Sequence, residues 1–152
     1  MNAKRFSLDA NVLIYFFDPR YPAKQAAAQR IMSLAMTRDC WIGLQAIGEF
    51  YTAATRKKIL TRTDAAHEAL GFLSNFSLFP ATPAAHRSAA HAVQAGRFSY
   101  WDAVLLESAA EAGCELLLSE DMQDGMTVGT LTIRNPFGPA GLSAAAAAAL
   151  AP

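Results

Sequence analysis

Acidic residues follow two apolar stretches of this chain and stand in two further segments. Asp9 comes directly after "RFSL", Asp121 lies just beyond "CELLLS", Glu49 is in the segment after "CWIGLQ", and Asp102 begins "DAVLLES". In parallel α/β sheets ligands bind beyond the carboxyl ends of the strands, so these carboxylates can converge on one edge. Clustered carboxylates repel one another unless a cation neutralises them. Oxygen ligands without His or Cys suit Mg²⁺ or Mn²⁺.

Three acidic positions also have a structural interpretation. Asp9 can cap the N-terminus of a helix that begins at Asn11. Glu49 shares a helical stripe with polar residues and can face solvent. Asp124 precedes a glycine and can shape a turn. Asp121 is hardest to explain in this way, because no helical pattern follows it.

Two capping-box patterns precede apolar runs, Thr61-x-x-Asp64 and Ser99-x-x-Asp102. In such a box the Ser or Thr side chain and the acidic side chain each bond a free N–H group of the first helical turn. The pattern alone therefore gives Asp64 and Asp102 the same structural role.

Short apolar segments alternate with helical segments along the chain. Strands are expected at 5–9, 40–45, 77–82, 114–119 and 130–137, the last at an edge of the sheet. Helices are expected from Asn11 and at 23–38, 46–57, 61–76, 83–96 and 100–113. The alternation predicts an α/β fold, a three-layer sandwich with a mainly parallel central sheet flanked by helices.

Composition limits the class of protein. The 152 residues suit one domain, and 53% hydrophobic residues with 17% charged residues indicate a folded chain. Thirteen basic residues balance thirteen acidic ones, which disfavours a bulk electrostatic nucleic-acid binder. No apolar run is long enough to span a membrane, and "MNAKRF" lacks the features of a signal peptide, so a cytoplasmic protein is expected.

The order of several short motifs resembles that of PIN-domain ribonucleases, above all the VapC-like toxins of bacterial toxin–antitoxin pairs. The matching motifs are "DAN" after the first strand, an acid within "GEFY", "WDA" at a helix start and "SED" after "ELLL". The closing "RNPF" also looks like the end of one toxin subgroup. The resemblance covers about residues 5–137 and implies a PIN-like nuclease domain at 1–137. Residues 138–152 are alanine-rich, and we expect them to form a disordered tail outside the fold.

The resemblance implies roles for individual residues. Asp9, Glu49, Asp102 and Asp121 match the acidic quartet of the family. Asp9, Asp102 and Asp121 would be metal ligands, and Glu49 would bind the metal directly or through water. Asn11 and Ser119 would fill supporting polar positions. Asp124 would either serve as a second acid near Asp121 or only shape the turn.

The implied reaction is hydrolysis of RNA phosphodiester bonds with Mg²⁺ or Mn²⁺. Arg56, Lys57 and Arg97 could contact RNA phosphates, although a solvated polar face explains them equally well. The three histidines lack an obvious acid–base partner. Alternatives are a structure-specific DNA nuclease on the same fold, or a non-catalytic dimer or RNA-binding module.

A homodimer and a cognate antitoxin are the expected protein partners. The resemblance implies both, with the antitoxin segment near the acidic cleft. Two helical segments also carry more large apolar groups than one buried face needs, which predicts an exposed interaction patch of Phe50, Tyr51, Leu70, Phe72, Leu73 and Phe76.

Overall fold

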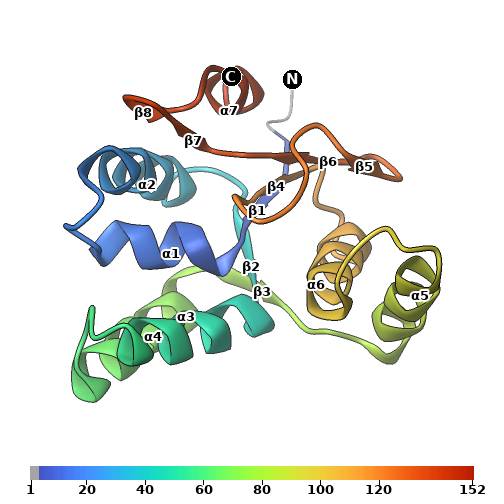
Figure 1. The fold of residues 1–152 in the computed structure, drawn as a ribbon, viewed down its shortest axis with the longest axis horizontal. Helices are drawn as coiled ribbons and strands as arrows, with labels where there is room; N and C mark the ends of the chain where they lie inside the picture. The colour runs from blue at the N-terminus through green and yellow to red at the C-terminus, as the bar shows by residue number, and fades with distance from the viewer. Residues whose placement is uncertain (1–3) are drawn as a thin grey trace.

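The computed structural model describes residues 4–152 (Figure 1). Its helices are α1 (Ala10–Phe17), α2 (Pro22–Ala35), α3 (Leu44–Arg56), α4 (Arg62–Asn75), α5 (Pro83–Gln94), α6 (Tyr100–Glu111) and α7 (Ala144–Ala149). Its strands are β1 (Phe6–Leu8), β2 (Trp41–Gly43), β3 (Ser77–Phe79), β4 (Leu116–Leu118), β5 (Thr127–Val128), β6 (Leu131–Arg134), β7 (Phe137–Gly138) and β8 (Gly141–Leu142).

The central strands run parallel. β1 pairs with β4 and β4 with β6 in parallel, β5 adds antiparallel to β6, and β2 pairs in parallel with β3. A parallel bridge between Phe6 and Cys40 joins the two groups, which gives the order β3-β2-β1-β4-β6-β5. Helices lie on both sides of these strands, so the predicted α/β sandwich is confirmed (Figure 1).

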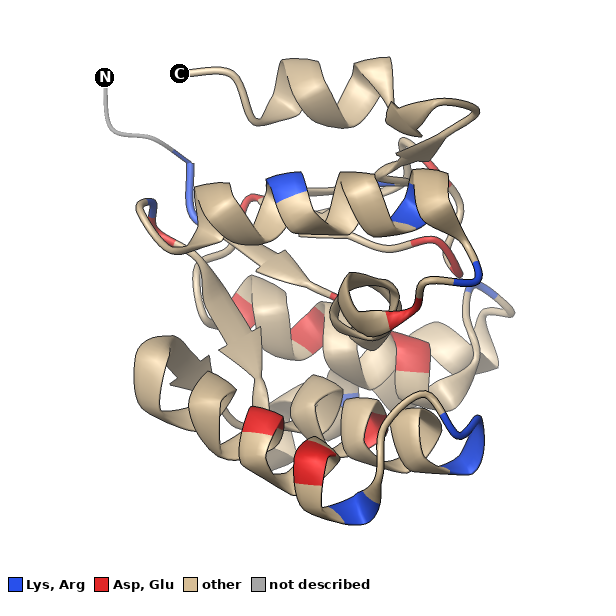
Figure 2. Cartoon of the chain, turned by 90° about the vertical axis from the view of Figure 1, so that its left-hand side faces the viewer, with Lys and Arg blue, Asp and Glu red and all other residues tan. Residues whose placement is uncertain are grey.

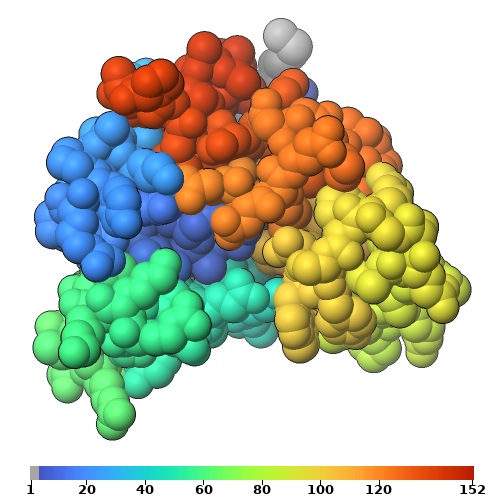
Figure 3. Space-filling view, viewed as in Figure 1, coloured from blue at the N-terminus to red at the C-terminus, as the bar shows by residue number. Residues whose placement is uncertain are grey.

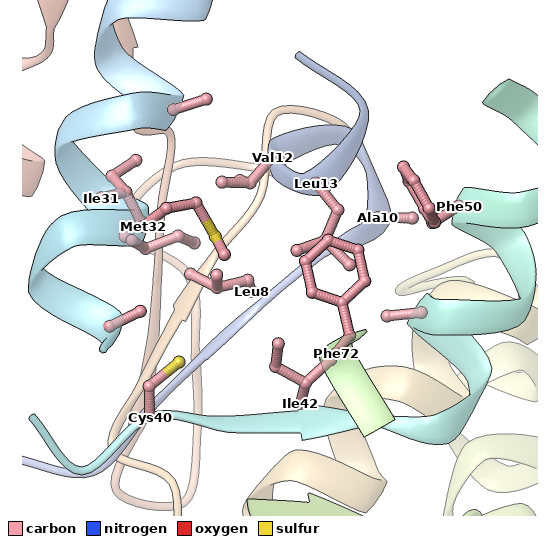
Figure 4. Close-up of a cluster of buried hydrophobic side chains, with 14 of the residues drawn as sticks. Leu8, Ala10, Val12, Leu13, Ile31, Met32, Cys40, Ile42, Phe50 and Phe72 are labelled. Carbon is pink, nitrogen blue, oxygen red and sulfur yellow. The ribbon is translucent and has the colours of Figure 1, made fainter. Parts of the chain in front are cut away.

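Side chains of β4 divide between two cores because successive residues of a strand point to opposite faces. Leu116 and Leu118 belong to the core that also contains Leu8 of β1 and apolar residues of α1 to α4. Leu117 packs instead with α6. Figure 4 shows the first core, in which side chains of α1 and α2 surround Leu8. A strand buried on both faces explains the unbroken apolar run "LLL".

Side-chain caps fix where the helices begin. Asp9, Thr61, Thr82, Ser99 and Ser143 each accept a hydrogen bond from a backbone N–H of the first turn. The hydroxyl half of both expected capping boxes is therefore present, at Thr61 and at Ser99. The cap at Asp9 ends β1 within one residue, so "NVLIYFF" continues as helix and not as strand.

The structure corrects the expected edge strand. β6 lies between β4 and β5, and the short β5 forms the edge. β5 has only two residues, Thr127 and Val128, so no alternating pattern of useful length revealed it.

The structure also differs from the expected disordered tail. Residues 141–142 form β8, which pairs with β7, and Ser143 caps α7. Ala146 and Leu150 are buried in the main core, and the guanidinium of Arg38 donates to the Leu150 carbonyl. Figure 2 shows this last helix above α2 without a charged residue. Burial of Ala146 and Leu150 in the main core stabilises a helix that would be marginal alone.

The predicted exposed patch is wrong in part. Phe50 is fully buried and Phe72 is 6% exposed, because their rings pack edge-on at 5.2 Å and close the core between α3 and α4. Leu70 and Leu73 of α4 remain exposed.

Candidate functional site

Asp9 is both a helix cap and a buried carboxylate at the floor of a cleft. Its Oδ1 accepts from the N–H of Ala10 at 2.7 Å, and its Oδ2 accepts from the hydroxyl of Ser119 at 2.6 Å. The side chain stands directly after β1, and its own N–H donates to the Leu118 carbonyl at the end of β4. The two interpretations of Asp9 are therefore compatible.

The environment of Asp9 opposes ionisation. Burial raises the pKa of its carboxyl to about 6, although the bonds from Ser119 and Ala10 act in the opposite direction. The charges of Glu49 and Asp121 raise this pKa further. An anion in this position is costly until a cation arrives.

The cleft has a volume of about 770 Å³ and lies between α1, α3, the start of α6 and the loop after β4. It is lined by Asp9, Ala10, Asn11, Ile14, Tyr15, Gln45, Gly48, Glu49, Thr52, Ala53, Arg56, Lys57, Trp101, Glu120 and Asp121. In Figure 3 the surface is hollowed between the green segment of α3 and α4 and the yellow segment of α6.

Asn11 and Ser119 connect the acids of two segments. The Asn11 amide donates to Asp121 Oδ2 at 3.2 Å and lies 3.5 Å from Asp9 Oδ2. The Ser119 hydroxyl donates to Asp9 and accepts from the N–H of Asp121 at 3.2 Å. These bonds hold Asp9 and Asp121 on the same side of the cleft.

Glu49 reaches the cleft from α3. Gln45, four residues earlier and therefore on the same helix face, donates from Nε2 to Glu49 Oε1 at 2.9 Å and to the Trp101 carbonyl at 3.1 Å. Ile47, almost opposite Glu49 around α3, is buried in the core. The exposed stripe expected for Glu49 is thus the wall of the cleft.

Asp102 lies beside the cleft and is not part of its lining. Its N–H donates to the Ser99 hydroxyl at 3.4 Å, as the capping box requires. Burial raises the pKa of Asp102, the bond to Ser99 lowers it, and the charge of Asp121 raises it. Asp102 therefore lies in the first turn of α6, which Ser99 caps, and is also electrostatically coupled to Asp121 of the cleft.

The structure places two of the candidate residues elsewhere. Asp124 accepts from the N–H of Asn135 at 2.9 Å and lies 3.7 Å from the Arg134 guanidinium, so it holds the loop before β5 against the end of β6. Arg97 stacks on Phe98 and reaches the Thr127 carbonyl. Neither lines the cleft, whereas Arg56 and Lys57 both do.

Asp9, Glu49 and Asp121 thus come from three segments to one cleft beyond the carboxyl ends of parallel strands. The profile of the PIN-domain family matches residues 7–123, the part of the chain that builds this cleft. The chain belongs to the PIN-domain family. A comparison with curated protein sequences finds no match.

Solved structures share this PIN fold at low sequence identity. VapC20 of Mycobacterium tuberculosis, a toxin that cleaves the sarcin–ricin loop, has a TM-score of 0.59 and 15% identity over 76% of this chain and 91% of that chain. DNA-bound VapBC of Salmonella typhimurium has a TM-score of 0.62 and 17% identity, with 86% and 97% covered. A toxin–antitoxin complex of Klebsiella pneumoniae has a TM-score of 0.59 and 19% identity, also with 86% and 97% covered.

PIN-domain nucleases generally use divalent ions. The oxygen atoms of this cleft should therefore be able to bind such an ion. Within residues 4–152, no three His, Cys, Asp or Glu side chains are close enough together to enclose a metal. Mg²⁺, however, keeps several waters and needs only one or two protein carboxylates. Two buried amide oxygens, Asn11 Oδ1 and Gln45 Oε1, have no hydrogen-bond partner in the described chain. The oxygen donors fit a hydrated hard cation.

The sequence did not predict the ion pair of Lys24 with Glu120 at the rim of the cleft. The Lys24 ammonium of α2 contacts Glu120 Oε2 at 2.5 Å and the Tyr15 hydroxyl at 3.3 Å, and Tyr15 donates to Glu120 Oε1 at 3.1 Å. The Lys24 ammonium neutralises the charge of Glu120. Glu120 therefore belongs to this ion pair and not to the group formed by Asp9, Glu49 and Asp121. Glu120 is visible in "SED", but no local pattern connects it to a lysine 96 residues away.

None of the helices in the described part of this PIN domain is sufficiently long and apolar to cross a membrane.

Proposed function

We propose that this protein is a divalent-metal-dependent endoribonuclease and the toxin of a toxin–antitoxin pair. Membership of the PIN-domain family supports a nuclease, which is a hydrolase. The observation that carries the proposal is the buried carboxylate of Asp9, whose pKa is raised where Glu49 and Asp121 line the same cleft. A site that disfavours its own negative charge is suited to bind a cation.

In this proposal Asp9 and Asp121 hold Mg²⁺ or Mn²⁺ from the cleft lining, and Asp102, beside the lining, and Glu49 hold it directly or through water. When bound, the cation would supply an activated water and stabilise the charge that develops on the phosphate. Ser119 and Asn11 fix the orientation of Asp9 and Asp121, so the donors need little rearrangement. Asp124 has no part in this site, because its carboxylate is bonded to Asn135 and Arg134.

Cations on one wall of the cleft would bind the RNA backbone. Arg56 and Lys57 lie at the C-terminal end of α3, within the lining that also contains Glu49. Phosphates on either side of the scissile bond could contact these two side chains while the scissile phosphate faces the acids. Arg97 is not part of this lining and is given no such role.

The test is side-by-side incubation of labelled RNA and labelled DNA with Mg²⁺, with Mn²⁺ and with EDTA. Cleavage of RNA alone, lost in EDTA and in Asp9→Asn, is the expected result. Cleavage of DNA alone would identify a DNA nuclease. Absence of cleavage, together with absence of cation binding by calorimetry, would indicate a non-catalytic module.

The toxin assignment has a separate test in bacteria. Two of the solved structures with this fold are toxin–antitoxin complexes, which supports an antitoxin partner for this chain. Expression of the unmodified chain should arrest growth of a bacterial host, whereas expression of Asp121→Asn at the same protein level should not. Equal growth of both strains would remove the toxin assignment and leave the nuclease assignment to be decided in vitro.

We propose that the antitoxin and a second copy of the chain use the apolar surfaces of the helices. A groove of about 300 Å³ between α1, α2 and α4 has a mostly apolar lining that includes Phe16, Phe17, Met32, Met36, Phe72 and Phe76. Leu70 and Leu73 are exposed on α4 nearby in the sequence. Light scattering at micromolar concentration should give the mass of a dimer, and a monomer mass would leave these surfaces to the antitoxin alone.

A further inference from the structure

Trp101 is exposed at the edge of the cleft. It is the second residue of α6, and 58% of its surface is accessible. Among the large apolar side chains that are exposed in residues 4–152, Trp101 is the one that lines the acidic cleft. An exposed indole beside a candidate active site is uncommon on a soluble surface and is typical of a binding position.

Neighbouring rings hold the indole in place. The Tyr100 ring lies 5.3 Å from the Trp101 ring at 88°, and the His86 ring of α5 lies 6.1 Å away at 85°. His86 Nδ1 and the Tyr100 hydroxyl form a hydrogen bond of 2.7 Å, which joins α5 to α6. A rigid aromatic group loses little side-chain entropy when a ligand stacks on it.

The backbone at Trp101 is tied to the acidic wall. Gln45 donates from one amide nitrogen both to the Trp101 carbonyl and to Glu49 Oε1, at 3.1 and 2.9 Å. This bond ties the start of α6 to the face of α3 that carries Glu49, and Trp101 and the carboxylates line the same cleft. A nucleotide whose phosphate faces the acids would have its base within reach of this ring.

The chemistry of the cleft indicates a nucleobase as the occupant. Arg56 and Lys57 supply positive charge for phosphates, Asp9 and Asp121 suit a cation, and Trp101 supplies the aromatic surface. Tyr15 on another part of the lining is already occupied by its contacts with Phe137 and Lys24. Stacking on exposed aromatic rings, combined with a cationic track for the backbone, is how proteins bind single strands.

We propose that Trp101 is a base-binding residue of this cleft, a stacking platform for an unpaired base next to the scissile phosphate. The inference rests on the proposed ribonuclease function and adds a substrate-binding residue to it. Bases within a duplex are stacked on one another and cannot reach the indole without being unpaired.

The chain offers a matched control because it has two tryptophans. Trp41 begins β2, at the opposite end of the strand from the cleft, where it donates to Asp39 and contacts Arg5. In Trp41→Phe the remaining tryptophan emission comes from Trp101, and in Trp101→Phe it comes from Trp41. We would titrate both variants, the unmodified chain and Trp101→Ala with an unstructured RNA 12-mer and with the same RNA in a duplex. Ca²⁺ would replace Mg²⁺ so that binding is measured without cleavage.

We expect the single strand to quench the emission of Trp41→Phe and to leave that of Trp101→Phe unchanged. Loss of one stacked base should weaken single-strand binding by Trp101→Ala roughly 5- to 150-fold, with Trp101→Phe between this value and the unmodified chain. Duplex binding should be weaker and should differ little among the variants.

Other outcomes would overturn the inference. Equal single-strand affinity of Trp101→Ala and the unmodified chain, with RNA still cleaved, would remove the stacking role and keep the proposed nuclease. Failure of the unmodified chain and of every variant to bind or cleave RNA would refute both the stacking role of Trp101 and the proposed nuclease function. A dimer mass in light scattering that Trp101→Ala alone converts to a monomer would show that the indole covers a second copy of the chain.

Discussion

Replacing Asp9 with Asn should stabilise the metal-free protein at neutral pH while it abolishes cleavage. The side chain is 4% exposed, and burial raises its pKa from 3.8 to about 6. A difference of one pH unit in pKa corresponds to about 1.4 kcal/mol between the two protonation states. The ionised carboxylate therefore lowers the free energy of unfolding by about 3 kcal/mol at neutral pH. The neutral amide of Asn removes this cost and can still accept from Ala10.

The pH dependence follows from the direction of the shift. The folded chain holds the Asp9 proton more tightly than the unfolded chain, so the native state binds more protons between pH 3.8 and about 6. The contribution of Asp9 to the free energy of unfolding therefore falls as the pH rises through this window. The stability difference between Asp9→Asn and the unmodified chain should be small near pH 4 and complete at about pH 7.

Thermal unfolding in EDTA, followed by circular dichroism from pH 4 to 8, measures this difference. For a chain of this size about 3 kcal/mol corresponds to a rise in Tm of roughly 6–12 °C. Mg²⁺ or Mn²⁺ at about one hundred times its Kd should stabilise the unmodified chain by about 2.7 kcal/mol and leave Asp9→Asn unchanged.

Asp64→Asn is the matched control for the Asp9 experiment. Asp64 is an exposed carboxylate in the first turn of α4, and its replacement should change the free energy of unfolding by less than about 0.5 kcal/mol with or without a cation. The reasoning is refuted if Asp9→Asn is no more stable than the unmodified chain at neutral pH in EDTA. It is also refuted if the difference is independent of pH.

Three further predictions concern single residues. Asp102→Asn should abolish cleavage while the protein stays folded, whereas Asp64→Asn should retain the full rate. Both acids lie in the first turn of a capped helix, but Asp102 stands beside the cleft and is coupled to the charge of Asp121. Equal rates in a gel assay would contradict this. Asp124→Ala should retain cleavage and lower the free energy of unfolding by about 1 kcal/mol in urea, since it loses the bond to Asn135, and loss of cleavage would return Asp124 to the site. Leu150→Ala should lower the free energy of unfolding by about 2–3 kcal/mol, because Leu150 is 5% exposed in the main core, and no change would mean that the last helix is detached in solution.

Much of the fold could be predicted from local sequence because the signals are local. The unbroken apolar run at 116–118 indicates a strand buried on both faces, and Leu116, Leu117 and Leu118 are indeed divided between two cores. Thr61 and Ser99 mark helix starts through hydrogen bonds that span only three residues. The α/β alternation then leaves few arrangements other than helices on both sides of a parallel sheet.

Other parts of the fold depended on long-range contacts. The alanines of 144–149 have no amphipathic pattern, and only burial of Ala146 and Leu150 in the main core fixes this segment as a helix of the domain. The number of large apolar residues in these two helical segments could not identify Phe50 and Phe72 as core residues. Their burial results from the packing of α3 against α4.

The candidate site is divided in the same way. The sequence by itself determined which carboxylates follow the strands, since Asp9 and Asp121 come at the ends of apolar runs and Glu49 shares a helix face with Gln45. The strand order decided the rest, because it sets Ser119 at 2.6 Å from Asp9 across 110 residues of chain. Likewise, only the packing of α2 against the loop after β4 pairs Lys24 with Glu120. A short sequence motif cannot predict such contacts. Their interaction energy depends on residues that are far apart in the sequence and come together only when the sheet has folded.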